Sequence, residues 1–150
     1  MMKNLLLCVV LCTGMVSLGH AQFRKIPNDV QDAFYEKYPD AEEAAWKNKE
    51  KIYQVSFLLM GIKFTADFDD KGFWLQCAQE IKPEGIPQKV QRSLTKSLYK
   101  DWLIKEAFFV IGPDERTEFR ILVSRSEVQQ RYISFDPEGK MLEDKDRRKV

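Results

Sequence analysis

The sequence predicts an α+β fold of two tandem α-β-β-β-β repeats, in which the helices pack on one face of an antiparallel sheet. Three observations lead to this prediction. An Ile-Pro pair opens a helix-spaced apolar series twice, strand-like alternation of apolar residues follows each series, and one type of turn recurs in both copies. Features that recur in the same order indicate a duplicated unit. We expect the first repeat with its linker at residues 22–85 and the second at residues 86–144.

One helix is expected after Ile26-Pro27 and another after Ile86-Pro87. Proline suits the first turn of a helix, because its missing N–H is not needed there. Pro39 is expected to end the first helix, since the residue before a proline avoids the helical conformation. Apolar residues at steps of four lie on one helical face. They are Val30, Phe34 and Tyr38 in the first helix, and Val90, Leu94 and Leu98 in the second.

Four strands are expected after each helix, because the apolar period changes from four to two. Alternation of this kind places one set of side chains on a buried face and the other on an open face. The charged residues 145–150 are expected to form a frayed tail. The expected strands of the first repeat span residues 45–48, 52–59, 62–68 and 73–78; those of the second span residues 107–111, 119–123, 133–135 and 140–143.

The recurring turn covers residues 68–72 and 135–139. Aspartate can bond the turn backbone, and glycine takes the left-handed position that ends the turn. Asp67, Asp69 and Asp70 near the first turn raise the alternative of a calcium site. An EF-hand loop would need an oxygen donor where Lys71 stands. A hairpin turn is therefore the preferred interpretation, and no metal site is predicted.

The N-terminal segment, residues 1–21, has the order of a secretory signal peptide: a basic start, an apolar run over residues 5–18 and small residues up to Ala21. The apolar run of 14 residues is shorter than the roughly 20 that span a bilayer. We expect cleavage near Ala21, no transmembrane anchor, and a periplasmic or secreted protein. Lipid attachment at Cys8 or Cys12 is the alternative, but both cysteines follow leucine rather than a small residue.

Cleavage would leave little chemistry for catalysis. It removes the only histidine, His20, and leaves Cys77 as the one cysteine, which we expect to be a partly buried, inert thiol. A chain without histidine cannot form a Ser-His-Asp or Cys-His arrangement or an ordinary structural zinc site. Its 23 basic residues (24 less Lys3) balance 23 acidic ones, which argues against nucleic acid as a partner. We predict a protein that is not an enzyme and that has no cofactor.

One set of positions resembles the PepSY-like family, which is related to the beta-lactamase inhibitory protein. The resemblance covers about residues 26–144 and implies a small exported protein with tandem repeats. The inhibitory protein binds an enzyme across a concave sheet. This chain lacks its paired cysteines and its inhibitory loop, so beta-lactamase inhibition is not carried over. The positions are Ile26-Pro27, Val30, Phe34, Tyr38-Pro39, Trp46, Tyr53, Val55, Phe57, Gly61, Phe68-Asp69 and Gly72.

The open face of the sheet is the expected binding surface. If Phe73 and Leu75 face the helix, alternation points Trp74 to the open face, whereas Trp46 and Trp102 are expected to pack against the helices. Tryptophan, tyrosine, methionine and arginine are enriched where proteins bind. The expected partner-binding residues are Trp74, Tyr132, Arg120, Leu122, Met141, Lys63 and Asp67, with Gln54 and Leu58 on the same face.

These observations predict an exported, non-enzymatic binding module of an inhibitor-like kind, which engages another exported or membrane-associated protein through that face. The alternative is a carrier of a small apolar ligand. A carrier would need a closed apolar cavity between the sheet and the helices, of about 300 Å³ or more.

Overall fold

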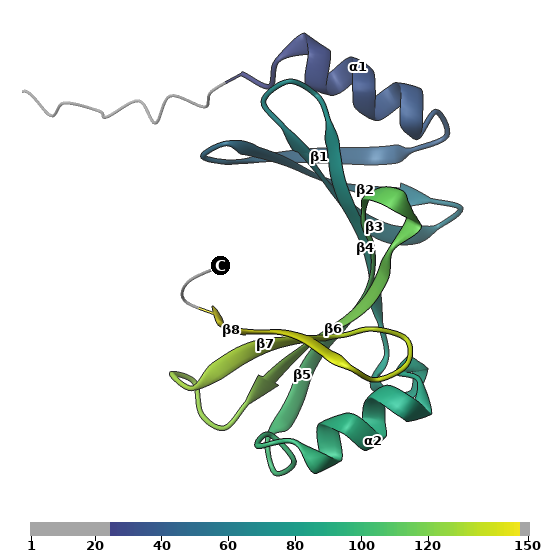
Figure 1. Ribbon diagram of the computed structural model, residues 1–150. Helices are drawn as coiled ribbons and strands as arrows, with labels where there is room; N and C mark the ends of the chain where they lie inside the picture. Colours follow the sequence, from purple (N-terminus) through teal and green to yellow (C-terminus); the bar gives the residue numbers. More distant parts are fainter. Residues whose placement is uncertain (1–24, 148–150) are drawn as a thin grey trace, which may run out of the picture.

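The computed structural model describes residues 25–147, and the expected signal peptide with Cys8, Cys12 and His20 lies outside them. Eight strands form one antiparallel sheet in which each strand pairs with its neighbours in sequence (Figure 1). In chain order the elements are α1 (Asn28–Lys37), β1 (Glu42–Lys49), β2 (Ile52–Leu59), β3 (Ile62–Asp69), β4 (Trp74–Ile81), η1 (Pro83–Gly85), α2 (Gln88–Lys96), β5 (Leu103–Ile111), η2 (Pro113–Glu115), β6 (Thr117–Ser124), β7 (Gln130–Phe135) and β8 (Met141–Asp146).

The predicted fold class, two tandem α-β-β-β-β repeats, is wrong. The structure is one continuous eight-stranded antiparallel sheet, to which α1 and α2 add only 10 and 9 residues of α-helix. The strands β4 and β5 pair with each other, from Cys77↔Ile111 to Ile81↔Ala107. This pairing satisfies backbone groups of β4 that would otherwise form an exposed edge. Periodicity along the chain is a local signal, and it did not show that the strands of the two halves join.

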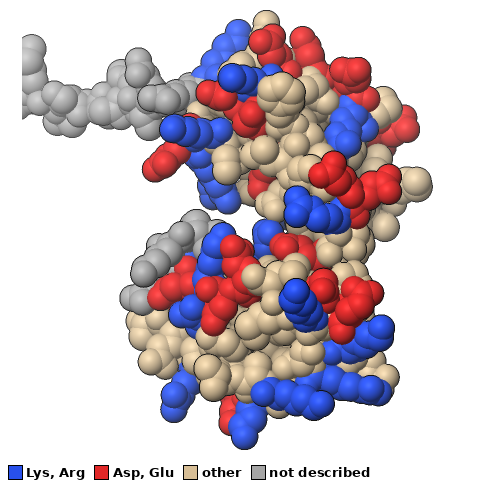
Figure 2. Space-filling model, in the orientation of Figure 1, with Lys and Arg blue, Asp and Glu red and all other residues tan. Residues whose placement is uncertain are grey.

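The sheet is strongly curved, and each helix lies on its convex side (Figure 1). The helix α1 lies over the strands β1 to β4, and α2 lies over the strands β5 to β8. We call the convex side the helix face and the concave side, which neither helix covers, the open face. The open face encloses a hollow between the two halves of the sheet (Figures 1 and 2).

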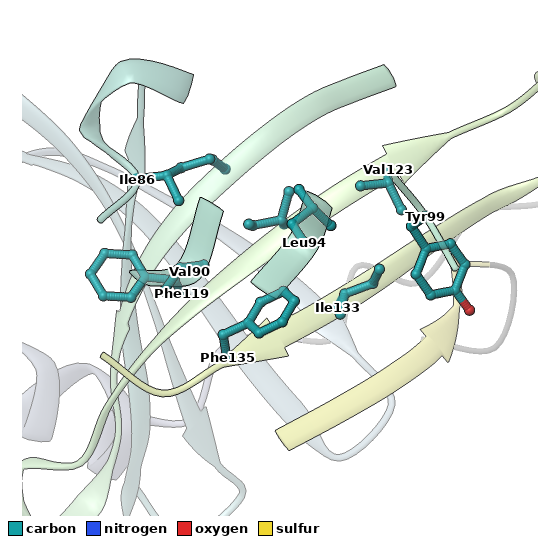
Figure 3. Close-up of a cluster of buried hydrophobic side chains, with 10 residues drawn as sticks. Ile86, Val90, Leu94, Tyr99, Phe119, Val123, Ile133 and Phe135 are labelled. Carbon is teal, nitrogen blue, oxygen red and sulfur yellow. The ribbon is translucent and has the colours of Figure 1, made fainter. Parts of the chain in front are cut away.

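Two hydrophobic cores lie between the helices and the helix face. In the first, the ring of Phe34 on α1 packs edge-on against Phe57 and Trp46, with centroids 5.1 and 5.4 Å apart. In the second, Val90 and Leu94 of α2 pack against alternate residues of β6 and β7 (Figure 3). Those strand residues are Phe119, Ile121, Val123, Ile133 and Phe135.

The second helix ends earlier than the sequence predicts. Leu98, expected on its apolar face, is 90% exposed. The Ser97 hydroxyl donates a hydrogen bond to the carbonyl oxygen of Leu94 (2.7 Å), and this side chain ends the helix by competing for its backbone. The buried Tyr99 takes the place in the core that was expected for Leu98.

The two edges of the sheet, β1 and β8, are irregular or highly charged. On β1 a register shift lies between Glu42 and Ala45, and Glu43 has a left-handed φ of 53°. On β8 four consecutive charged residues run from Glu143 to Asp146. The strand β8 ends at Asp146, beyond the end at residue 143 that the sequence predicts. Arg131 of β7 forms an ion pair with Asp144 in this added part of the strand.

Each recurring turn packs against the first residues of a helix: Gly72 against α1 and Gly139 against α2. Asp69 and Asp136 accept backbone hydrogen bonds within their turns, which agrees with the hairpin interpretation. Gly72 and Gly139 have φ values of 84° and 88°. A Cβ atom at Gly139 would lie 2.7 Å from the carbonyl oxygen of Lys89 on α2, so the glycine is required for space as well as for conformation. Within residues 25–147 no group of three or more acidic, histidine or cysteine side chains could hold a metal ion.

We predict that Gly139→Ala destabilises the fold much more than Gly61→Ala. Both glycines have positive φ, which costs an alanine about 1–2 kcal/mol. A Cβ atom at Gly61 would meet nothing within 4 Å, whereas at Gly139 the clash with α2 adds roughly 1–3 kcal/mol. Urea unfolding followed by circular dichroism measures both losses. Equal losses in the two variants would show that the turn does not press against α2.

We also predict that the fold loses stability as the pH rises above 10. The pKa of Tyr38 is raised well above its ordinary value, mainly by burial and to a smaller extent by a hydrogen bond with Cys77. The pKa of Tyr99 is raised mainly by burial and to a smaller extent by a hydrogen bond to Asp144. The unfolded chain therefore releases these protons first. The contribution of each tyrosine is fully present below pH 10 and is lost as the pH rises through its folded pKa.

The measurement is the free energy of unfolding between pH 8 and pH 11.5. Tyr38→Phe should flatten the fall by up to about 1.4 kcal/mol per pH unit. Tyr35→Phe, which changes a 48% exposed side chain, is the matched control and should follow the parent protein. If Tyr38→Phe left the pH profile unchanged, burial of the Tyr38 hydroxyl would not contribute to it.

Candidate functional site

Two of the expected binding residues, Trp74 and Met141, lie on the helix face, so their expected placement on the open face is wrong. Trp74 pairs with Phe68, and Met141 pairs with Phe135. Directly paired residues of antiparallel strands project to the same side, and both phenylalanines lie in the cores. Trp74 accordingly packs against the first core, where the ammonium group of Lys37 lies 4.2 Å from the centroid of its ring.

A β-bulge at the same point of each half explains both errors. The register moves from Asp67↔Gln76 to Phe68↔Trp74, which leaves Leu75 as an extra residue. The equivalent shift in β8 leaves Leu142 as an extra residue. An extra residue reverses the alternation of the side chains that lie beyond it in the strand. Simple counting through the bulge therefore assigns Trp74 and Met141 to the wrong face.

The other five expected residues, Tyr132, Arg120, Leu122, Lys63 and Asp67, are on the open face. Arg120 and Leu122 alternate with the core residue Ile121 on β6, and Tyr132 pairs directly with Leu122. Asp67 pairs with Gln54, and Lys63 pairs with Leu58. Asp67 is linked to Arg120 through hydrogen bonds with Gln76. Lys63 lies at the start of β3, away from these hydrogen bonds.

A network of side-chain hydrogen bonds crosses the open face from β2 to β7. Gln54 and Gln76 donate to the two carboxylate oxygens of Asp67, at 2.8 and 2.6 Å. The Nη2 atom of Arg120 donates to Gln76 Oε1 (3.1 Å) and to Glu118 Oε1 (2.6 Å). The Ser134 hydroxyl completes the network by donating to Glu118 Oε1 at 3.3 Å. We call these six side chains the polar network.

Long side chains of the open face lie across neighbouring strands and bury small apolar patches. Arg120 on β6 reaches Gln76 on β4, so it crosses β5, where Val110 is only 2% exposed. The Tyr132 hydroxyl lies 3.5 Å from Glu106 Oε2, and this pair spans Leu122, which is 1% exposed. Neither Val110 nor Leu122 belongs to a helix-covered core. A concave face brings side chains together, so the open face is partly packed.

Sequence reasoning missed Gln76, Glu118, Ser134 and Glu106. Glu118 and Ser134 could have been found, because they alternate with the core residues Phe119, Ile133 and Phe135. Gln76 could also have been found, because alternation from Leu75, which was expected to face the helix, points it to the open face. Glu106 lies before the expected strand 107–111, next to a register shift between Ile104 and Glu106 that no feature of the sequence marks.

The polar network is suited to binding by hydrogen bonds. Asp67 is 8% exposed and both of its oxygens are engaged, so it serves to hold the network in place. Arg120 keeps 27% of its side chain exposed, and its hydrogen bonds to the described residues all come from Nη2. Its Nε and Nη1 atoms are thus donors that a bound molecule can use. Basic and acidic side chains are mixed around the hollow, which therefore has no single sign of charge (Figure 2).

A pocket of about 350 Å³ opens between the start of β3, the end of β4 and the strand β5, and it does not match the cavity that a carrier of apolar ligands would need. It is open, and five of its nine lining residues are charged. The helix-covered first core, in contrast, is filled by packed aromatic rings. The pocket is lined by Ile62, Lys63, Glu80, Ile81, Lys82, Pro83, Lys105, Glu106 and Ala107.

Cys77 is a buried free thiol on the helix face. Burial is the main reason that its pKa is raised, and the hydrogen bond with Tyr38 opposes this effect. A thiol in such surroundings is mostly protonated at neutral pH and is a poor nucleophile.

The fold is similar to those of several solved proteins from Bacteroides. A DUF2874 family protein from Bacteroides uniformis is 25% identical, with a TM-score of 0.70 over 79% of this chain and 88% of that one. A BLIP-like protein from Bacteroides fragilis is 24% identical, with a TM-score of 0.70 over 84% and 89%. A proposed periplasmic protein from Bacteroides eggerthii is 23% identical, with a TM-score of 0.70 over 81% and 88%.

No family model and no curated protein sequence matches the chain. Within residues 25–147 no helix has the length and hydropathy needed to cross a membrane. The resemblance to PepSY-like proteins stays a prediction. The structural similarity supports the other part of that resemblance at the level of fold: the chain has a BLIP-like fold.

Proposed function

We propose that this protein is an exported, non-enzymatic binding module that engages a protein partner through the open face of its sheet. The observation that carries the proposal is the polar network, which holds Arg120 with free donors on a concave surface that neither helix covers. The partner is another exported or membrane-associated protein that presents a convex surface to the hollow. The similarity to a BLIP-like protein and to a proposed periplasmic protein supports this assignment.

The open face favours binding because its side chains are already ordered. Binding usually costs roughly 0.5–1.5 kcal/mol for each mobile side chain that becomes fixed. Arg120 is held by Glu118 and Gln76, and Tyr132 pairs with Leu122 and reaches across it to Glu106. Arginine and tyrosine are among the residues that most often dominate binding energy. Such residues can contact a partner without paying the full ordering cost.

The face also suits recognition better than catalysis. Each oxygen of the Asp67 carboxylate accepts a hydrogen bond from a glutamine, and Glu118 accepts from Arg120 and Ser134. Each acid therefore has a structural partner, and neither is placed beside a second carboxylate in the network. These arrangements support a role in binding for the polar network.

The test is site-specific photo-crosslinking in the organism that encodes the full chain. A photoreactive residue replaces Thr65 or Leu58 on the open face, or Glu36 or Arg92 on the exposed side of the helices. We expect the same partner to be crosslinked from both open-face positions and from neither helix position. Crosslinks from the helix positions alone, or equally from both faces, would contradict the proposal.

Arg120→Ala and Tyr132→Ala should then each weaken binding to that partner by about tenfold or more, as for residues central to an interface. Arg92→Ala removes the same side chain from the exposed surface of α2 and is the matched control, which should bind like the parent protein. Trp74→Phe should also bind normally, because Trp74 lies on the helix face. Thermal unfolding of each variant shows that any loss of binding is not a loss of fold.

A further inference from the structure

The pocket arises where the strands β3 and β4 separate at one end of their ladder. The β3–β4 ladder ends at Phe64↔Gln79, whereas the β4–β5 ladder continues to Ile81↔Ala107. Ile62 and Lys63 still pair with β2 but have no partner on β4. The space of about 350 Å³ that opens there lies between the start of β3, the end of β4 and the strand β5. Its volume is within the range of pockets that bind small molecules.

The pocket has an excess of positive charge that the described residues do not neutralise. Three lysines, Lys63, Lys82 and Lys105, line it together with Glu80 and Glu106. None of the three ammonium groups makes an ion pair within 4 Å in residues 25–147. Glu106 lies within 3.5 Å of the Tyr132 hydroxyl and is thereby oriented at one side of the pocket. The lining thus has a net charge of +1, which suits a monoanion better than a dianion.

The other four lining residues form an apolar wall. They are Ile62, Ile81, Pro83 and Ala107. Ala107 belongs to the second core and Ile81 packs against that core, so both side chains are held in fixed positions. Ligand pockets commonly combine such a wall with a few polar groups that orient the ligand. A molecule that fits this lining has a charged head and a short hydrocarbon part.

We propose that this pocket binds a small organic monoanion, a carboxylate carried on a short hydrocarbon chain. The carboxylate lies among the three lysine ammonium groups, and the chain lies against the apolar wall. This site is separate from the polar network, and its existence does not depend on the proposed protein partner.

The test is titration of the uniformly ¹⁵N-labelled protein with sodium hexanoate at constant ionic strength, followed by amide chemical shifts. Two comparison ligands separate the parts of the proposal: 1-hexanol has the chain without the charge, and inorganic phosphate has charge without the chain. We expect saturable shifts of amides around Lys63, Ile81 and Ala107 with hexanoate, and binding at least about threefold weaker with each comparison ligand. Equal binding of 1-hexanol, or shifts scattered over exposed lysines, would overturn the proposal.

Charge variants provide the second part of the test. Lys82→Gln and Lys105→Gln should each weaken hexanoate binding by about threefold to fivefold, as expected for partly exposed charges. Lys89→Gln removes the same charge from α2, outside the pocket lining, and should leave the affinity unchanged. Glu80→Gln should have the opposite effect and tighten binding by about twofold or more. Unchanged affinity in both pocket-lysine variants, or weaker binding in Glu80→Gln, would show that the lysines do not form the site.

Discussion

The pairing of β4 with β5 is the interaction on which the whole structure depends. Each helix packs over its own half of the sheet, and the two hydrophobic cores are separate. The strand β4 serves both, since Cys77 lies in the first core and Ile81 packs against the second. Two units of about 60 residues would each bury too little surface to be robust alone. Their union through one ladder gives a single sheet, and the curvature of that sheet creates the hollow.

The open face gains its character from this union. The hydrogen bond from Arg120 to Gln76 joins side chains of the two halves across β5, so the polar network belongs to neither half alone. Val110 and Leu122 are buried beneath such long side chains although no helix covers them. The surface is therefore ordered before anything binds to it. The pocket also depends on this pairing, because β5 stays paired with the end of β4 after β3 has separated from it.

Local periodicity was sufficient to place most elements, and it failed where geometry is not local. Val30, Phe34, Val90 and Leu94 face the cores as their spacing predicts, and Arg120, Leu122 and Tyr132 follow from alternation with Ile121 and Ile133. The bulges at Leu75 and Leu142 left no such signal, because each lies in a run without clear apolar–polar alternation. Trp74 and Met141 were misplaced for that reason. The fold class was wrong because the pairing of β4 with β5 across the intervening helix α2 does not appear in the spacing of side chains.

The irregular edges of the sheet affect whether copies of the molecule can associate through their backbones. A continuous antiparallel sheet with two free edges is a template on which further copies could add strands and grow into filaments. The left-handed Glu43 interrupts one edge, and the charged run from Glu143 to Asp146 discourages stacking at the other. Backbone-directed polymerisation is thereby disfavoured at both ends. Recognition is left to side chains, which can discriminate between molecules in a way that exposed backbone cannot.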